Sequence, residues 1–232
     1  WQLTKHSRGI HNAWQFWFEL TLVFTAQCFR SGGLRCSPLN AALGENMDDD
    51  RTTKELIEIL GTDYEFFHGE IISRLDEGEK GQDGLTSADF QFEARQLVRA
   101  AFAYIEAVTF SVKVHSAMVC DRNDVYLSDA ERNFIGEIQF SLNDKGEVVE
   151  RAAQIKLTQN IRFAFNLLAR SRQIESKFDP STEWWSCLRS AIRVRDRLMH
   201  PRLPIDLDIS VKELLDVMKA KHGFDKLLME YP

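Results

Sequence analysis

A periodic run of apolar residues in the middle of the chain constrains its fold more than any other feature. Apolar side chains recur there every three or four residues, at Ala94, Leu97, Ala101, Ile105, Val108 and Val112. This spacing places them on one face of an α-helix. The sequence predicts that helix over residues 88–119, a length of about 48 Å at the usual rise per residue. Such a helix needs partners along its whole apolar face, so we expect a helical bundle.

Capping signals predict where other helices begin. A Ser or Thr followed three residues later by an acid, which is typical of a helix N-terminus, occurs at Thr86, Ser128 and Ser210. A further helix over 156–172 is indicated by the same apolar periodicity. The helix after Ser210 is expected to end near His222 and Gly223, because glycine is common just past a helix end.

An alternating segment interrupts the helices. Ile138, Phe140 and Leu142 alternate with polar residues, and turn-forming residues follow at 143–146 before a second apolar pair. This order is typical of a β-hairpin. The fold class we expect is therefore mainly α, with a helical bundle, a helical N-terminal extension and one small β-hairpin.

A polar, glycine-containing segment at 76–84 has the composition of a linker and predicts a domain boundary. We expect a helical N-terminal portion at 1–80, for which the sequence indicates no role, and a second helical domain at 86–225. Within the first portion, Gly61 predicts the end of a short helix over 53–60.

Cysteine usage and hydropathy favour a cytoplasmic protein. Cys28, Cys36, Cys120 and Cys187 are dispersed, without metal-ligand spacing, as is typical of reduced intracellular thiols. The apolar run at 14–29 contains polar residues and is too short to span a bilayer. We expect no membrane association, no metal and no cofactor.

Charge is distributed unevenly along the chain. The net charge is −6, yet residues 151–202 hold 11 Lys and Arg against 4 Asp and Glu, a balance of +7. The remaining residues hold 18 basic and 31 acidic side chains. A basic third of this kind attracts a polyanion, or it is an ordinary solvated helix surface; charge alone leaves both interpretations open.

Arg195, Asp196 and His200 lie in this basic third and are the candidate catalytic residues. Arginine holds a phosphate through a permanent charge, and histidine exchanges protons near neutral pH. Pro201 follows His200, and a residue before proline avoids the helical region. The helix should therefore end near Met199 or His200, which frees the imidazole to turn toward Arg195.

Arg195 falls on the apolar face predicted for its helix. The other members of that face are Trp185, Leu188, Ile192 and Met199. An unpaired guanidinium is costly to bury. Either Asp196 or a distant carboxylate pairs with it, or its tip reaches the surface, or the face lines a cleft that receives a phosphate. Glu106 on the long helix either reaches this cleft or is an ordinary surface glutamate.

At these residues the chain resembles the HEPN family (higher eukaryotes and prokaryotes nucleotide-binding domain). Its active members have an arginine, then Asn, Asp or His, then three residues and a histidine, and residues 195–200 match each position. The flanks, Trp185-x-x-Leu188 and Pro201, and the apolar-Glu pattern at 104–107 also look like this family. The resemblance covers about residues 86–225.

The resemblance implies an all-α bundle that forms a homodimer, in which two motifs build one composite cleft. It also implies metal-independent cleavage of RNA through the ribose 2′-OH. By this analogy His200 would be the general acid/base, Arg195 would hold the scissile phosphate, and Asp196 would orient one of them. The candidate RNA-binding residues are Arg189, Arg193, Arg197 and Arg202.

The resemblance further suggests a role in antiviral defence, abortive infection or toxin-like RNA cleavage, with a regulatory protein as a second partner. A toxin paired with a nucleotidyltransferase antitoxin is disfavoured, because Arg202 stands where that subfamily has tyrosine. Two alternatives remain at this point. One is a non-catalytic HEPN-type module that binds a nucleotide or a protein, and the other is a purely structural helical domain.

Overall fold

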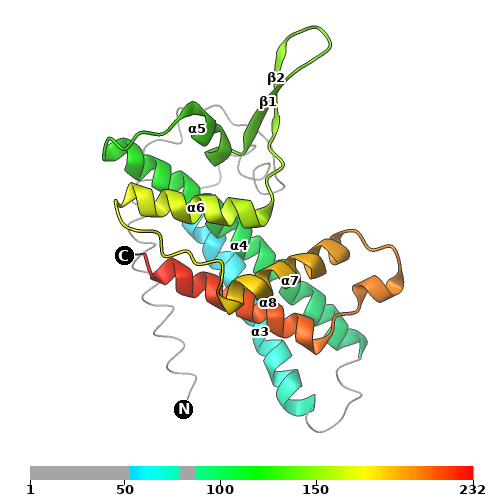
Figure 1. Ribbon diagram of the computed structural model, residues 1–232. Coiled ribbons are helices and arrows are strands. Elements are labelled where there is room, and N and C mark those ends of the chain that lie inside the picture. Colours follow the sequence, from blue (N-terminus) through cyan, green and yellow to red (C-terminus); the bar gives the residue numbers. More distant parts are fainter. Residues whose placement is uncertain (1–52, 79–86, 232) are drawn as a thin grey trace. The chain divides into compact units, whose positions relative to one another are not determined.

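The computed structural model describes residues 53–78 and 87–231 (Figure 1). These residues form mainly helices, together with one two-stranded antiparallel sheet, which confirms the predicted mainly α class with a small hairpin. The elements are α3 (Thr53–Gly78), α4 (Ala88–Arg122), α5 (Asp129–Ile135), β1 (Ile138–Leu142), β2 (Val148–Ala152), α6 (Leu157–Ser171), α7 (Glu183–Met199), the 3-10 helix η2 (Pro204–Leu207) and α8 (Val211–Met229).

The chain divides into two compact units, each built from segments distant in sequence. The motif unit, so named because it contains Arg195, comprises Leu56–Glu106 and Asp179–Glu230. The hairpin unit comprises Ala107–Phe178, Tyr231 and, among the described residues, the first turn of α3. The predicted N-terminal portion up to residue 52, with Cys28 and Cys36, lies outside the described residues. So does most of the predicted linker, which begins inside α3.

Helix α4 is the long helix predicted from the apolar periodicity. Its N-terminal half belongs to the motif unit and its C-terminal half to the hairpin unit. Every member of the predicted apolar face is buried: Ala94, Leu97, Ala101, Ile105, Val108 and Val112. At its start the Ser87 hydroxyl accepts a hydrogen bond from the Phe90 amide at 3.2 Å, while Thr86 lies outside the described residues.

The two other predicted capping boxes are confirmed. Ser128 caps α5 and Ser210 caps α8, and each hydroxyl accepts a hydrogen bond from the amide three residues later. The acids at that position, Glu131 and Glu213, accept hydrogen bonds from the cap amides in return. These starts were predictable because both partners lie within four residues of sequence.

Two predicted helix ends are wrong. Helix α3 continues past Gly61 to Gly78, and α8 continues past Gly223 to Met229. A Cβ at Gly223 would lie 2.2 Å from the Cβ of Trp184 in α7. Gly223 therefore allows α8 to approach α7 closely, and this role replaces the helix stop that its residue type suggested.

A buried lysine ties three helices of the motif unit together. The Lys221 ammonium on α8 lies 4.5 Å from the ring centre of Tyr64 on α3 and 4.6 Å from that of Tyr104 on α4. It also makes an ion pair with Asp225 at 2.7 Å. The two rings and the carboxylate compensate for the removal of the ammonium from water.

The hairpin unit has a small core of its own, formed by Cys120, Leu127, Ile135 and Leu167. Strands β1 and β2 pair antiparallel, with Ile138 opposite Ala152 and Leu142 opposite Val148. Gly146 adopts a φ of +77° in the turn between them, a conformation that glycine adopts without a Cβ penalty. No helix within the described ranges is both long enough and apolar enough to cross a bilayer.

Candidate functional site around Arg195

Arg195 lies near the end of α7, and carboxylates from two helices bind its guanidinium. Nη1 donates to Oε1 of Glu106 on α4. Nε and Nη2 both donate to Oδ1 of Asp196, at 3.1 and 2.9 Å. The sequence left open whether the adjacent acid or a distant carboxylate pairs with this arginine, and in the structure both do.

An aromatic ring completes the environment of Arg195. The guanidinium carbon lies 5.0 Å from the ring centre of Phe102. Phe102 and Glu106 are four residues apart on α4, so one helix face presents both the ring and the carboxylate. The Arg195 side chain retains 25% exposure, and a cation held over a ring at this depth is both ordered and reachable from solvent.

The local charge balance opposes an incoming anion. One guanidinium faces two carboxylates, which leaves a net charge of −1 at the site. The Glu106 and Asp196 side chains are 43% and 58% exposed, so either can exchange its contact for water. A phosphate that binds Arg195 therefore competes with a carboxylate already in place.

His200 is the C-cap of α7, as the proline after it predicted. Its backbone leaves the helical region, with φ −133° and ψ 54°, and its amide donates to the Asp196 carbonyl at 3.1 Å. The imidazole is exposed. Within the part of the chain that the structure describes, no hydrogen bond joins it to Arg195. The structure thus brings together Arg195, Asp196 and Glu106, and leaves His200 at the helix end.

The buried face of α7 differs from the predicted one. Trp185 and Leu188 are buried as expected, but Met199 is 59% exposed. The remaining buried positions are Cys187, Ala191, Val194 and Leu198. The apolar face that contacts the rest of the unit therefore turns away from Met199, because Leu198 takes the last core position before the helix ends.

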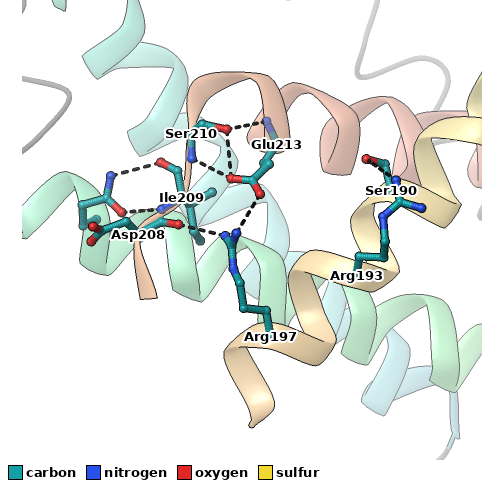
Figure 2. Close-up of polar contacts among 8 residues, drawn as sticks. Ser190, Arg193, Arg197, Asp208, Ile209, Ser210 and Glu213 are labelled. Atoms are coloured by element: carbon teal, nitrogen blue, oxygen red, sulfur yellow. Dashed lines mark hydrogen bonds and ion pairs between the residues drawn. The ribbon is translucent and has the colours of Figure 1, made fainter. Parts of the chain in front are cut away.

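Arg189, Arg193 and His200 share the solvent face of α7. Together with Asp196 they recur at spacings of four, three and four residues, and all four are exposed. Arg193 makes one contact in Figure 2, from Nη2 to the Ser190 hydroxyl at 3.4 Å. This face can present two cationic side chains to a ligand that reaches His200.

Arg197 has a structural role, which Figure 2 shows. Its Nη2 donates to the Asp208 carbonyl at 2.8 Å, and its Nη1 lies 3.1 Å from Oε1 of Glu213. Burial works to raise the pKa of Glu213, but hydrogen bonds from Ser210 and Arg197 lower it on balance. Arg197 therefore fixes the start of α8. Arg202 is different, because its side chain is exposed and its contact is made by the backbone amide, which donates to Asp206 at 2.7 Å.

Of the three residues that contact the guanidinium, the sequence singled out Asp196 and, as one of two alternatives, Glu106, but not Phe102. The signal available for it was its position one helical turn before Glu106 on the long helix. Within residues 53–78 and 87–231, no group of three or more His, Cys, Asp or Glu side chains is placed to hold a metal ion.

The chain matches no protein-family model, and neither a curated protein nor a solved structure matches it.

Proposed function

We propose that this protein is a metal-independent endoribonuclease of the HEPN type that uses Arg195, Asp196 and His200. The observation that carries the proposal is the state of Arg195. Its guanidinium is ordered over Phe102 by carboxylates that reach solvent, five residues before an exposed histidine that ends the helix. A preordered cation and a proton-exchanging group are the minimum that cleavage of a phosphodiester requires.

The reaction follows from these groups. The ribose 2′-oxygen attacks the adjacent phosphorus while His200 removes its proton. The bond to the 5′-oxygen breaks, and that oxygen takes up a proton to leave as a 5′-hydroxyl. The other product carries a 2′,3′-cyclic phosphate. Arg195 stabilises the charge that develops on the non-bridging oxygens. DNA lacks the 2′-hydroxyl and is not cut.

Two proton transfers in one reaction favour a homodimer. Each chain supplies one histidine in this motif, so two copies that share a cleft supply both a base and an acid. Arg189 and Arg193, on the same solvent face of α7 as His200, would contact phosphates that flank the scissile one. RNA cleavage of this kind suits a defence or abortive-infection role, with a regulatory protein partner that controls it.

The test compares purified wild-type protein with His200→Ala and Arg195→Ala on mixed single-stranded RNA in the presence of EDTA. We expect each substitution to lower the cleavage rate by about 100-fold or more. His222→Ala is the matched control, because His222 is an exposed histidine outside the motif. Cyclic phosphate ends should appear only with the wild type and the control. Equal cleavage by all four proteins would refute the proposal.

The neutralised state of Arg195 favours one alternative, a non-catalytic HEPN-type module that binds a nucleotide or a protein. Under that alternative the Glu106 and Asp196 contacts are permanent. It predicts no RNA cleavage by the wild type. It also predicts nucleotide or partner binding that survives His200→Ala, because a binding module needs no proton transfer.

A further inference from the structure

Among the residues that the structure describes, no backbone group is bonded to the outer edge of strand β1. The Asn143 amide donates to the Glu147 carbonyl at 3.0 Å, and the Ala153 amide donates to the Glu137 carbonyl at 2.8 Å. In an antiparallel ladder every second residue faces the neighbouring strand. The odd-numbered residues of β1 therefore face β2, and the backbone groups of Ile138, Phe140 and Leu142 point away from it.

The same three residues share one face of the hairpin, together with Glu150, which lies opposite Phe140 on β2; Phe140 and Leu142 are exposed there and Ile138 is half-buried. Side chains alternate between the two faces of a strand, so Ile138, Phe140 and Leu142 lie together. Phe140 is 53% exposed and Leu142 is 68% exposed. Val148, opposite Leu142 on β2, is 69% exposed. Figure 1 shows the two strands as a narrow ribbon that extends away from α5.

The two edges of the hairpin differ in charge. Strand β2 carries Glu150 and Arg151, whereas β1 has the sequence Ile-Gln-Phe-Ser-Leu and carries no charge. Charged side chains on an edge strand discourage pairing with another strand, and an uncharged apolar edge favours it. The β1 edge is therefore the one open to strand addition.

We propose that β1 pairs antiparallel with β1 of a second copy of this chain, around a two-fold axis at Phe140. This register places Phe140 opposite the partner's Phe140, and Ile138 opposite the partner's Leu142. All the outward backbone groups of β1 are then paired, and apolar residues meet apolar residues. On the other face Gln139 lies opposite the partner's Ser141, so no like charges meet.

A second copy fits this edge for two reasons. The β1 sequence is complementary to itself in the register centred on Phe140, whereas a shift of the axis to Gln139 or Ser141 leaves one end of the strand unpaired. An isolated two-stranded hairpin is also marginal in water, and pairing converts it into a four-stranded sheet. This inference concerns the hairpin unit and does not depend on the activity proposed for the motif unit.

In the proposed register Phe140 lies on the two-fold axis, so a side chain substituted at this position lies opposite the same side chain of the partner chain. The association of the full chain is measured by sedimentation equilibrium for wild type, Phe140→Lys, Phe140→Glu and an equimolar mixture of these two variants. We expect Phe140→Glu alone to raise the dissociation constant at least about tenfold, because like charges face each other across the axis and Glu150 lies opposite each of them. Phe140→Lys alone should raise it too, but by less, because each Lys also lies opposite Glu150 of its own chain. In the mixture Lys faces Glu, and association should return.

Val148→Lys is the matched control for Phe140→Lys, because it adds the same charge to the same face of the hairpin but one strand away from the proposed contact. It should associate like the wild type. The inference is overturned if the wild type is monomeric at its highest soluble concentration. It is also overturned if the single variants associate as the wild type does, or if mixing them restores nothing. A dimer that forms through another surface gives the second of these results.

Discussion

The close approach of α8 to α7 at Gly223 makes a quantitative prediction for Gly223→Ala. A Cβ at this position would lie 2.2 Å from Cβ and 2.3 Å from Cγ of Trp184. Carbon atoms in contact are ordinarily about 3.5–4.0 Å apart. A rotamer change of Trp184 cannot move its Cβ, so the two helix backbones must separate by more than about 1 Å to relieve the contact.

Two opposing effects set the size of the change. Alanine is favoured over glycine inside a helix by about 1 kcal/mol. Overpacking costs about 1–3 kcal/mol, and a clash with atoms next to the backbone belongs at the upper end. We therefore expect Gly223→Ala to lower the free energy of unfolding by about 2 kcal/mol, and the midpoint of thermal unfolding by about 4–8 °C.

Gly61→Ala provides the control, since Gly61 also lies inside a helix. There the new Cβ would meet the Tyr104 ring at 3.6 Å, an ordinary contact. This substitution should raise the free energy of unfolding by about 1 kcal/mol. Urea unfolding of both variants, followed by circular dichroism, measures the two changes. If Gly223→Ala stabilises the protein as Gly61→Ala does, the explanation of Gly223 by helix contact is refuted.

Three further predictions concern stability and are measured by urea unfolding. Glu137→Ala should lower the free energy of unfolding by about 3–5 kcal/mol, because it leaves the fully buried Lys113 ammonium without the carboxylate 2.7 Å away. Lys113→Met should lower it by less, because it removes the buried charge together with its need for a partner. Ser210→Ala should cost about 1 kcal/mol, and Thr182→Ala less, because the Thr182 hydroxyl caps no helix amide. Burial and two nearby arginines lower the pKa of His115 to about 4, so the unfolded state binds more protons between about pH 6.5 and 4. As the pH is lowered through that range, the free energy of unfolding should therefore decrease, and His115→Leu should reduce this decrease.

Local signals in the sequence were sufficient for most of the fold. The cap at Ser128 and the cap at Ser210 each depend on a partner three residues away, and the apolar face of α4 is a regular repeat. Pro201 ended α7 at His200 for an equally local reason. Features of this kind are predictable because the residues that cause them are neighbours in the chain.

The errors arose where a residue's role depends on a distant segment. Gly223 suggests a helix end by its type, but its reason for being glycine is Trp184, on another helix. For Arg195 the sequence left several alternatives open, because the carboxylate that pairs with it besides Asp196 belongs to Glu106, 89 positions earlier in the chain. The sequence of α7 alone predicts neither the Gly223–Trp184 contact nor the Glu106–Arg195 ion pair, because both depend on how α4, α7 and α8 pack.

At the anion site proposed around Arg195, the geometry favours a phosphate but the net charge opposes it. A guanidinium has five N–H groups, and the described contacts with Glu106 and Asp196 use three of them. Two donors remain to direct hydrogen bonds at a phosphate, so the shape of the site is already present. Its net charge is unfavourable until a carboxylate withdraws. Asp196 is next to Arg195 in α7, whereas Glu106 lies on a different helix, α4. Under the proposed function, withdrawal of Glu106 brings the net charge of the site from −1 to 0, while Phe102 and Asp196 keep the guanidinium in place.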